Sequence, residues 1–428
     1  MKKNKTEDYN TNRMNLLPYE EITFEDTPSK SQMTDEEINK RYVKGDIRIV
    51  TETARYSLAG ILSMLKETVE KGEPRYKLDP EYQRRHRWST ERKSRLIESF
   101  LMNVPVPPVF LYERDLARFE VMDGRQRLNA LSEFYANKFA LEGLQYWTEL
   151  HGRTYSTLPS KVRDGIDRRY ISSIILLKET ASSEKQAAQL KKMVFERLNS
   201  GGVRLSNQET RNAVYDGPLN QLCLRLSENL EFRSMWGIPN ESLSEIKDEE
   251  EFEEKDDTTK SGQKLFESMG DVELVLRFFA YRQINRFPGG LNKISAFLDR
   301  FLIEGNKFKK EILSEYEEMF EKTISFVIQL LGKRAFCLRN SDGKPRGRAT
   351  KIIYDPLMFV SNQYSRGADR EKLLSGKNVL VKELSNMYKE YGSLFAGRRT
   401  NTADMNQRNE YISNVFQNAL EKMRCEGS

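Results

Sequence analysis

The sequence of 428 residues contains only two histidines, His86 and His151, and only three cysteines. Cys223, Cys337 and Cys425 stand far apart, and no pair has the short spacing of a zinc ribbon. This usage argues against zinc and against a disulfide framework, and it is typical of a protein in a reducing cytoplasm. Because no histidine follows His151, the second half lacks the histidine that a His-Asn-His nuclease needs as base or ligand.

Other common signatures are missing as well. The chain has no GxxxxGK(S/T) segment, which argues against a P-loop NTPase, and it has no GxSxG segment. The longest apolar runs, at residues 171–177 and 272–281, are too short or too interrupted to span a bilayer. Residues 1–15 are polar and show no secretory signal. These absences predict a cytoplasmic protein that does not enter a membrane.

Charge is plentiful and unevenly distributed. Charged residues make up 31% of the sequence, and the formal net charge is +6. Residues 248–257 contain eight acids and one lysine, so this run carries −7 and the remainder of the chain carries +13. A chain with that distribution attracts polyanions such as DNA. Solvated basic surfaces are also common on proteins, so charge alone leaves both interpretations open.

The pattern of apolar residues divides the chain into three parts. Residues 1–45 are polar with little periodicity, and we predict a flexible extension there. Residues 46–215 alternate short strand-like and helical segments, whereas residues 216–428 are mainly helical with an acidic loop at 247–260. The predicted fold class is therefore α+β: a small mixed-sheet domain followed by a mainly α-helical domain.

Individual elements can be placed from apolar spacing and capping residues. Residues 57–71 and 89–102 have helical spacing, and Ser89 or Thr90 is the expected N-cap of the second helix. Strand composition is found at residues 76–78, 109–112, 119–122 and 171–177. In the second domain, helical spacing recurs at residues 218–229, 271–283, 295–302, 312–331, 379–391 and 411–423.

The segment with the clearest chemistry is Asp123-Gly124-Arg125-Gln126-Arg127, which lies between a predicted strand and a predicted helix. Unpaired backbone N–H groups and the positive end of the helix dipole make such a turn a natural phosphate site. Gly124 would let the backbone approach an anion, Arg127 can add a bidentate contact, and Asp123 can hold a metal ion or orient a water. The competing interpretation is that Asp123 merely caps the helix and the arginines are solvated.

Two further segments are weaker candidates. Residues 82–88 (YQRRHRW) combine cationic and aromatic groups, including Gln83 and Arg84, which suit phosphate contact and stacking. Residues 195–206 contain Asn199 and a Gly201-Gly202 turn before the N-cap-like Ser206. Taken separately, the first segment is explained better as a basic loop anchored by one buried tryptophan, and the second as an ordinary Gly-Gly turn.

The order and spacing of these segments are more specific than each segment alone. Tyr82-Gln83-Arg84…Trp88, then 96–99 (LIES), 104–109 and 121–128, resembles the N-terminal-domain family of GmrSD-type restriction endonucleases. Residues 195–212 and 271–279 are similar to further blocks of that family, so the resemblance spans roughly residues 50 to 300. It implies a ParB/sulfiredoxin-like fold for residues 46–215 and a nucleotide-binding, often NTP-hydrolysing module that regulates or performs DNA cleavage in phage defence.

The resemblance also suggests roles for particular residues. The Asp-Gly-Gln-Gln-Arg motif of the family corresponds to Asp123–Arg127, with Arg125 in place of the first glutamine, and His86 stands where a tyrosine is common. The expected cofactor is a nucleoside triphosphate with Mg²⁺, held without zinc. The predicted catalytic residues are Asp123, Gln126 and Arg127, with Asp123 also the candidate metal ligand. The predicted phosphate-binding residues are Gln83, Arg84, Gly124, Arg125, Asn199, Gly201 and Gly202.

The partner and the cutting step stay open at this point. Larger relatives carry a C-terminal His-Asn-His nuclease domain, which the histidine count excludes here. Either this chain cuts DNA itself, or a separate nuclease subunit cuts, or the protein binds DNA and senses modification without catalysis. A structural or regulatory partner of a nearby toxin or nuclease is a further alternative. DNA is the expected partner, a homo-oligomer is compatible with the sequence, and no membrane contact is expected.

Overall fold

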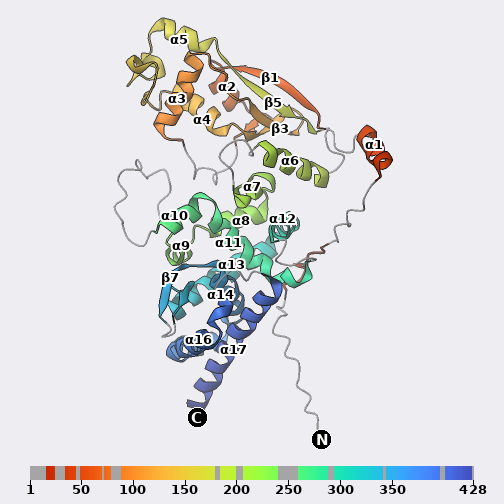
Figure 1. Cartoon of the computed structure of the whole chain (residues 1–428), viewed down its shortest axis with the longest axis vertical. Helices are drawn as coiled ribbons and strands as arrows, with labels where there is room; N and C mark the ends of the chain where they lie inside the picture. Colours follow the sequence, from red (N-terminus) through yellow and green to blue (C-terminus); the bar gives the residue numbers. More distant parts are fainter. Residues whose placement is uncertain are drawn as a thin grey trace. The chain divides into compact units, whose positions relative to one another are not determined.

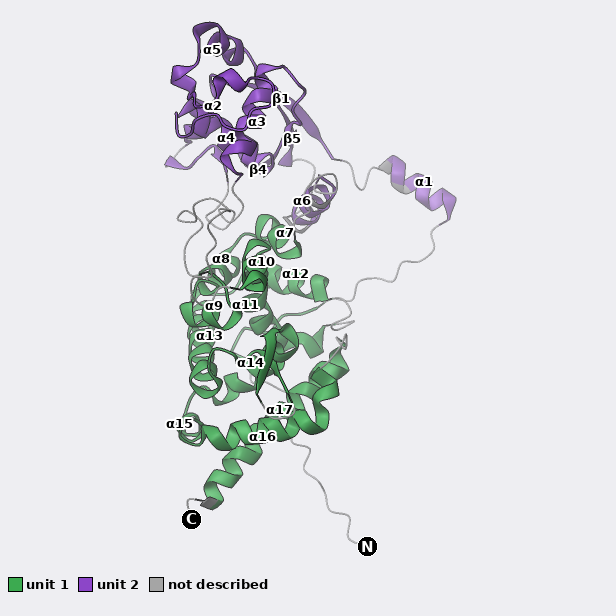
Figure 2. Cartoon of the chain, turned by 60° about the vertical axis from the view of Figure 1, so that its left-hand side comes forward, with its two compact units in different colours: residues 1–28, 206–428 green, residues 29–205 purple. Residues whose placement is uncertain are grey.

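The structure is a computed structural model. It describes residues 16–24, 34–44, 49–69, 72–78, 88–178, 184–198, 206–239, 259–287, 294–340, 344–395 and 401–426. The chain forms two compact units (Figures 1 and 2). Residues 29–205 form an α/β unit, and residues 1–28 together with 206–428 form a helical unit. This arrangement is the α+β class predicted from the sequence.

The α/β unit is built on a five-stranded mixed sheet with the strand order β1-β5-β3-β4-β2. Its strands are β1 (Thr51–Ser57), β2 (Tyr76–Lys77), β3 (Val109–Asp115), β4 (Arg118–Asp123) and β5 (Tyr170–Leu176). Strands β3 and β4 form an antiparallel hairpin, while β3 runs parallel to β5 and β2 runs parallel to β4. Its helices are α1 (Asp35–Lys44), α2 (Ile61–Lys66), α3 (Thr90–Leu101), α4 (Arg125–Tyr135), α5 (Ser160–Asp167) and α6 (Glu184–Leu198), with short 3-10 turns at Thr148–Leu150 and Tyr155–Thr157.

Helices cover both faces of this sheet. Val109, Leu111 and Val121 point into a core that they share with α2, α3 and α4, where Ile97 and Leu128 are fully buried. The alternate residues of the strands, such as Tyr112 and Glu120, face α6 instead. Figure 1 shows α6 apart from the group formed by α2, α3 and α4. The second face is covered in part, because the side chains of β1 are largely exposed and β3 and β4 mix apolar with charged residues.

Most elements predicted for this unit are confirmed. Ser89 is the N-cap of α3 and accepts a hydrogen bond from the backbone N–H of Arg92. The predicted strands correspond to β2, β3, β4 and β5 within a few residues. The helix predicted over residues 57–71 is wrong at its start, because Ser57 ends β1 and the helix α2 covers only Ile61–Lys66. Strand β1 was not predicted: it is an edge strand with largely exposed side chains, so it carries no strong apolar signal.

The helical unit contains the elements predicted for the second half, plus one small β-ribbon. Its helices are α7 (Asn207–Val214), α8 (Pro218–Leu226), α9 (Leu230–Trp236), α10 (Lys260–Glu267), α11 (Gly270–Ala280), α12 (Ile294–Gly305), α13 (Lys310–Leu331), α14 (Lys351–Tyr364), α15 (Ala368–Ser375), α16 (Lys377–Tyr391) and α17 (Thr402–Glu426), with 3-10 turns at Tyr281–Arg286 and Gly392–Phe395. Strands β6 (Cys337–Arg339) and β7 (Pro345–Ala349) form the antiparallel ribbon between α13 and α14.

Part of the N-terminal segment belongs to the helical unit. The carboxylate of Glu20, which is fully buried, accepts hydrogen bonds from Arg282 at 2.6 Å and from the hydroxyl of Tyr316 at 2.7 Å. Phe24 packs edge-on against Phe287. The sequence predicted a flexible extension over residues 1–45. Residues 16–24 are instead held in place, because Glu20 and Phe24 contact residues more than 260 positions away in the sequence.

The boundary between the units also differs from the predicted one. It falls between residues 205 and 206, whereas the sequence placed it after residue 215. Helix α7 belongs to the helical unit because its Arg211 and Asn212 are buried there. Among the described residues, no helix is both long and apolar enough to cross a bilayer.

Candidate phosphate-binding turn

The turn from β4 into α4 has the geometry that the sequence predicted. Asp123 is the last residue of β4 and pairs with Phe110 of β3, and Gly124 is the N-cap of α4. Gly124 has φ +91°, a conformation that other residues adopt at a cost. A Cβ atom at Gly124 would lie 2.5 Å from Cγ1 of Val109. The glycine is therefore required by the backbone conformation and by packing against β3, independently of any ligand.

Asp123 and Arg127 form an ion pair across the first turn of α4. Nη2 of Arg127 lies 2.6 Å from Oδ2 of Asp123, and Nη1 of the same guanidinium donates to the carbonyl of Pro107, also at 2.6 Å. The Arg127 side chain is 11% exposed, whereas the Asp123 side chain is 43% exposed. The largely buried side chain of Arg127 thus fixes the position of the Asp123 carboxylate, which stays partly exposed to solvent.

Helix α4 begins at a glycine, which has no side chain that could cap the helix. No side-chain hydrogen bond is made at Gly124, and no acidic residue lies in the first turn. Oδ2 of Asp123 pairs with Arg127, and the N-cap residue of α4 is Gly124. The backbone N–H groups of the first turn have no partner within the helix, which makes this end favourable for an anion. Arg125 and Gln126 occupy the first two helical positions and are both partly buried.

The sheet topology brings a second chain segment to the same edge. Strands β2 and β4 are adjacent and parallel, with Lys77 beside Glu120, so both strands leave the sheet at the edge where Asp123 lies. The carboxyl edge of parallel strands is where ligands usually bind in such sheets. The segment that follows β2 contains Gln83 and Arg84, but these residues lie outside the described part of the chain, as do Asn199, Gly201 and Gly202. Their predicted roles stay predictions.

A buried ion pair fixes β4 from the opposite face of the sheet. Nζ of Lys191 in α6 lies 2.7 and 2.8 Å from the two carboxylate oxygens of Glu120, and it stands over the ring of Tyr112. The side chains of Lys191 and Glu120 are 11% and 13% exposed. Burial, together with the charge of Glu120, raises the pKa of Tyr112. This cluster joins α6, which precedes residues 199–205, to the strand that ends at Asp123.

Glu98 in the 96–99 segment has a structural role. Its buried carboxylate accepts hydrogen bonds from the backbone N–H groups of Gln145 (3.2 Å), Tyr146 (2.7 Å) and Trp147 (2.9 Å). Burial acts to raise the pKa of Glu98, but the three hydrogen bonds outweigh it, so the pKa lies below its usual range. By accepting three backbone hydrogen bonds, the buried carboxylate of Glu98 fixes the backbone of residues 145–147 to α3.

That loop lines a groove that sequence reasoning missed. The groove has a volume of about 480 Å³, and its lining includes the exposed rings of Tyr146 and Trp147 together with Arg153 of the following turn. None of its lining residues belongs to the 123–127 turn. The aromatic pair was visible in the sequence, but only the hydrogen bonds to Glu98 show that its backbone is held in place.

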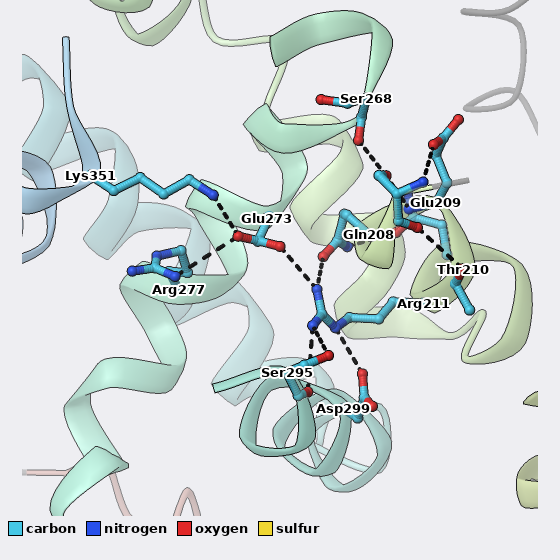
Figure 3. A network of polar contacts seen from close by, with 12 residues as sticks. Gln208, Glu209, Thr210, Arg211, Ser268, Glu273, Arg277, Ser295, Asp299 and Lys351 are labelled. Carbon is cyan, nitrogen blue, oxygen red and sulfur yellow. Dashed lines mark hydrogen bonds and ion pairs between the residues drawn. The ribbon is translucent and has the colours of Figure 1, made fainter. Parts of the chain in front are cut away.

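The helical unit contains a different charged cluster, centred on Arg211 of α7 (Figure 3). The Arg211 guanidinium lies 2.8 Å from Asp299 and 3.1 Å from Glu273, and its side chain is 2% exposed. Glu273 also pairs with Lys351, and the neighbouring Arg277 pairs with Asp355. Burial acts to raise the pKa of Glu273, but the charges of Lys351, Arg211 and Arg277 prevail and lower it to about 2. Its burial and its matched charges make this cluster a structural one.

The metal ligand predicted from the sequence is the carboxylate of Asp123, which is 43% exposed. Among the residues that the structure describes, no group of three or more histidine, cysteine, aspartate or glutamate side chains is placed to hold a metal ion. An ion at the exposed carboxylate of Asp123 would take its other ligands from phosphate oxygens and water, as Mg²⁺ commonly does.

The fold and this turn define a class: an α/β module with a glycine at the start of a helix and an oriented carboxylate at one edge of a mixed sheet. The family model described as "GmrSD restriction endonuclease, N-terminal domain" matches residues 63–215. These residues belong to that family. The match is narrower than the resemblance predicted over residues 50–300, and it includes α7, which lies beyond the boundary of the α/β unit. In comparisons with curated proteins and with solved structures, the chain matches none.

Proposed function

We propose that this protein acts in restriction or phage defence, and that its α/β unit binds and hydrolyses a nucleoside triphosphate at the 123–127 turn to control DNA cleavage. The family of residues 63–215 supports the restriction role. The single observation that carries the nucleotide site is the Arg127–Asp123 pair, which holds an exposed carboxylate beside the N-terminus of α4. The ParB-like fold and the nuclease step belong to the same proposal.

The residues of the turn divide the work. Backbone N–H groups at the start of α4 donate hydrogen bonds to the phosphate oxygens, an arrangement favoured by the helix dipole. Arg127 has guanidinium hydrogens beyond those used by Asp123 and Pro107, and its charge stabilises the negative charge that builds up during phosphoryl transfer. Asp123 orients the attacking water through its free carboxylate oxygen. Gln126, one position before Arg127, assists in placing that water.

We expect this site to depend on a divalent cation. Asp123 places a negative charge at the helix N-terminus, where it repels a phosphate in the absence of a metal ion. Mg²⁺ would supply the positive charge that allows a carboxylate and a phosphate to share the site. Removing the charge of the Asp123 carboxylate should therefore strengthen nucleotide binding in the absence of metal and should slow nucleotide turnover in its presence.

The experiment compares wild-type protein with Asp123→Asn, Arg127→Met and the control Glu91→Gln. Glu91 forms an i,i+4 pair with Arg95 on the surface of α3, with both side chains 51% exposed, and it matches the charge change of Asp123→Asn. Binding of each nucleoside triphosphate is measured with Mg²⁺ and with chelator, and turnover is measured with and without DNA. A loss of about 10²–10³-fold in turnover is expected for Asp123→Asn and Arg127→Met, since each removes charge from the reacting centre.

The outcomes separate the proposal from its alternatives. Asp123→Asn should bind nucleotide in chelator at least as well as the wild type binds it, whereas Glu91→Gln should behave as wild type throughout. Equal background turnover in all four proteins would remove the enzymatic part of the proposal.

A second candidate function rests on the histidine count. Because only His86 and His151 are present, a separate nuclease subunit is a natural source of the cutting step, with this chain as the nucleotide-gated DNA-binding or modification-sensing partner. Incubation of the purified chain with modified and unmodified DNA, nucleotide and Mg²⁺ tests this directly. Cleavage by the chain alone assigns the nuclease to it; turnover without cleavage favours the separate subunit.

A further inference from the structure

The ribbon in the helical unit lies within a strongly basic stretch of the sequence. Residues 333–351 contain seven basic residues and one acid, Asp342, which gives the stretch a net charge of +6. The basic residues are Lys333, Arg334, Arg339, Lys344, Arg346, Arg348 and Lys351. This stretch alone carries a charge equal to the formal net charge of the whole chain.

The base of the ribbon is built into the core. Phe336 is fully buried, with its ring 5.7 Å from that of Trp236 and 5.0 Å from that of Tyr354. The backbone N–H of Thr350 donates to the carbonyl of Phe336 across the two strands. Nη2 of Arg334 donates to the carbonyl of Gly347 at 3.1 Å. A two-stranded ribbon is marginally stable alone, so this anchoring is what keeps it in place.

The charged residues lie on the exposed part of the ribbon. Lys333, Arg334, Lys344, Arg346 and Arg348 are exposed in the structure. Two of the seven basic residues are placed differently. Lys351 pairs with Glu273, and Arg339 is half-buried, which lowers its pKa.

A β-bulge opens the outer strand. Leu338 pairs with Arg346 and Cys337 pairs with Ala349, so one step along β6 spans three steps along β7. Gly347 sits in this bulge with φ +70°. Bulges increase local twist and redirect side chains, and they prevent an edge strand from pairing with another sheet. Strand β7 therefore displays Arg346 and Arg348 without offering a flat edge to another chain.

The chemistry that fits this element is a polyphosphate backbone. Arginine binds phosphate through two parallel hydrogen bonds, and a two-stranded ribbon fits the major groove of B-form DNA, which is about 12 Å wide. The major groove of an RNA duplex is deep and narrow and does not admit such a ribbon.

We infer that the β6–β7 ribbon is a docking element for duplex DNA, with Arg346 and Arg348 as its principal phosphate contacts. The choice of DNA as partner rests on the proposed function, whereas the location of the contact rests on the ribbon itself. The helical unit thereby supplies DNA affinity, separately from the nucleotide chemistry of the α/β unit. Phosphate contacts of this kind position a protein on DNA and carry little sequence information.

The test is the affinity of the full chain for a labelled DNA duplex over a range of salt concentrations. The ribbon variant is Arg346→Glu with Arg348→Glu, and a milder version uses Gln at both positions. The matched control is Lys382→Glu with Lys389→Glu, two exposed positions on α16 that give the same change in net charge. Thermal unfolding and nucleotide turnover without DNA are measured for every protein, so that a folding defect or a failed nucleotide site is recognised separately.

The ribbon variant should lose at least about tenfold in DNA affinity, and its slope of log affinity against log salt should fall by about 1.8, since each lost phosphate contact contributes about 0.9. The Gln variant should show the same direction with a smaller loss, and the α16 control should keep the wild-type slope. An unchanged slope in the folded ribbon variant, or an equal loss in the α16 control, overturns the inference. The inference is also overturned if the ribbon contributes as much affinity for an RNA duplex, or for phosphatidylserine vesicles, as it does for the DNA duplex. If the wild type hydrolyses nucleotide but its DNA binding does not depend on the ribbon, only the ribbon inference is rejected. If DNA binding depends on the ribbon but no nucleotide is hydrolysed, only the nucleotide site is rejected.

Discussion

The two arginine–carboxylate clusters of this protein use the same chemical groups in opposite surroundings. Arg127 holds Asp123 at the end of a strand, and the carboxylate stays 43% exposed. Arg211 lies between Asp299 and Glu273 with only 2% of its side chain exposed, and the two acids are 10% and 16% exposed. A charge that stays exposed can meet a ligand, whereas buried charges that satisfy one another mainly specify packing. Exposure, and not the type of residue, separates the candidate site from the structural cluster.

The largest expected effect is on the buried cluster. Arg211→Met should destabilise the helical unit by about 3–5 kcal/mol, because the buried acids lose their shared positive charge. Urea unfolding monitored by the fluorescence of Trp236, the tryptophan of the helical unit, measures this loss of unfolding free energy. The other two tryptophans, Trp88 and Trp147, are replaced by Phe in both the reference protein and the variant.

The matched control for that variant is Arg225→Met. Arg225 pairs with Glu317 on the surface, where its side chain is 59% exposed, and its removal should cost less than about 1 kcal/mol. Equal losses for the two variants would contradict the contrast between buried and exposed pairs.

The pH dependence of the helical unit should follow from Glu273. Its pKa is about 2 in the folded protein, below the usual value of about 4.3, so ionised Glu273 stabilises the fold at neutral pH. The stabilisation that ionised Glu273 contributes, about 3 kcal/mol in total, is complete above about pH 4.3 and is lost as the pH falls toward 2. Unfolding free energies between pH 6 and pH 2.5 measure it, and Glu273→Gln, although less stable at pH 6, should show a flatter profile than the wild type.

Glu98 provides an intermediate case within the α/β unit. Glu98→Gln should cost about 2 kcal/mol, because an amide cannot replace a carboxylate that accepts three backbone hydrogen bonds. The fluorescence of Trp147, whose N–H is one of the three donors, should report a looser loop before global unfolding. The isosteric comparison is Glu142→Gln, an exposed acid on the adjoining segment, which should leave the loop unchanged.

Apart from the control variants, the smallest effect on stability is expected at the candidate site itself. Arg127→Met should reduce the unfolding free energy by only about 1 kcal/mol, since its ion pair is partly solvated. The same variant is expected to lose most of its nucleotide turnover. A loss of stability as large as that of Arg211→Met would indicate that the Arg127–Asp123 pair is a structural cluster after all.

Local patterns were sufficient for much of the α/β unit. Ser89 caps α3 as predicted, and Gly124 stands where β4 becomes α4, because capping residues and glycines act within a few positions of their own chain. Strand β1 and the β6–β7 ribbon escaped prediction since exposed, charged strands carry no apolar alternation. The docking of residues 16–24 depends on Arg282 and Tyr316, which no local pattern could associate with Glu20.

The candidate site divides in the same way. The sequence by itself determined the strand-to-helix turn, its glycine and the charges within it, because these follow from the order of residues along one short stretch. Only the tertiary structure decided that Arg127 pairs with Asp123 and with the carbonyl of Pro107, and that the equally charged Arg211 is sealed in a core. Whether a charged group is exposed depends on the elements packed around it, and those elements come from distant parts of the chain.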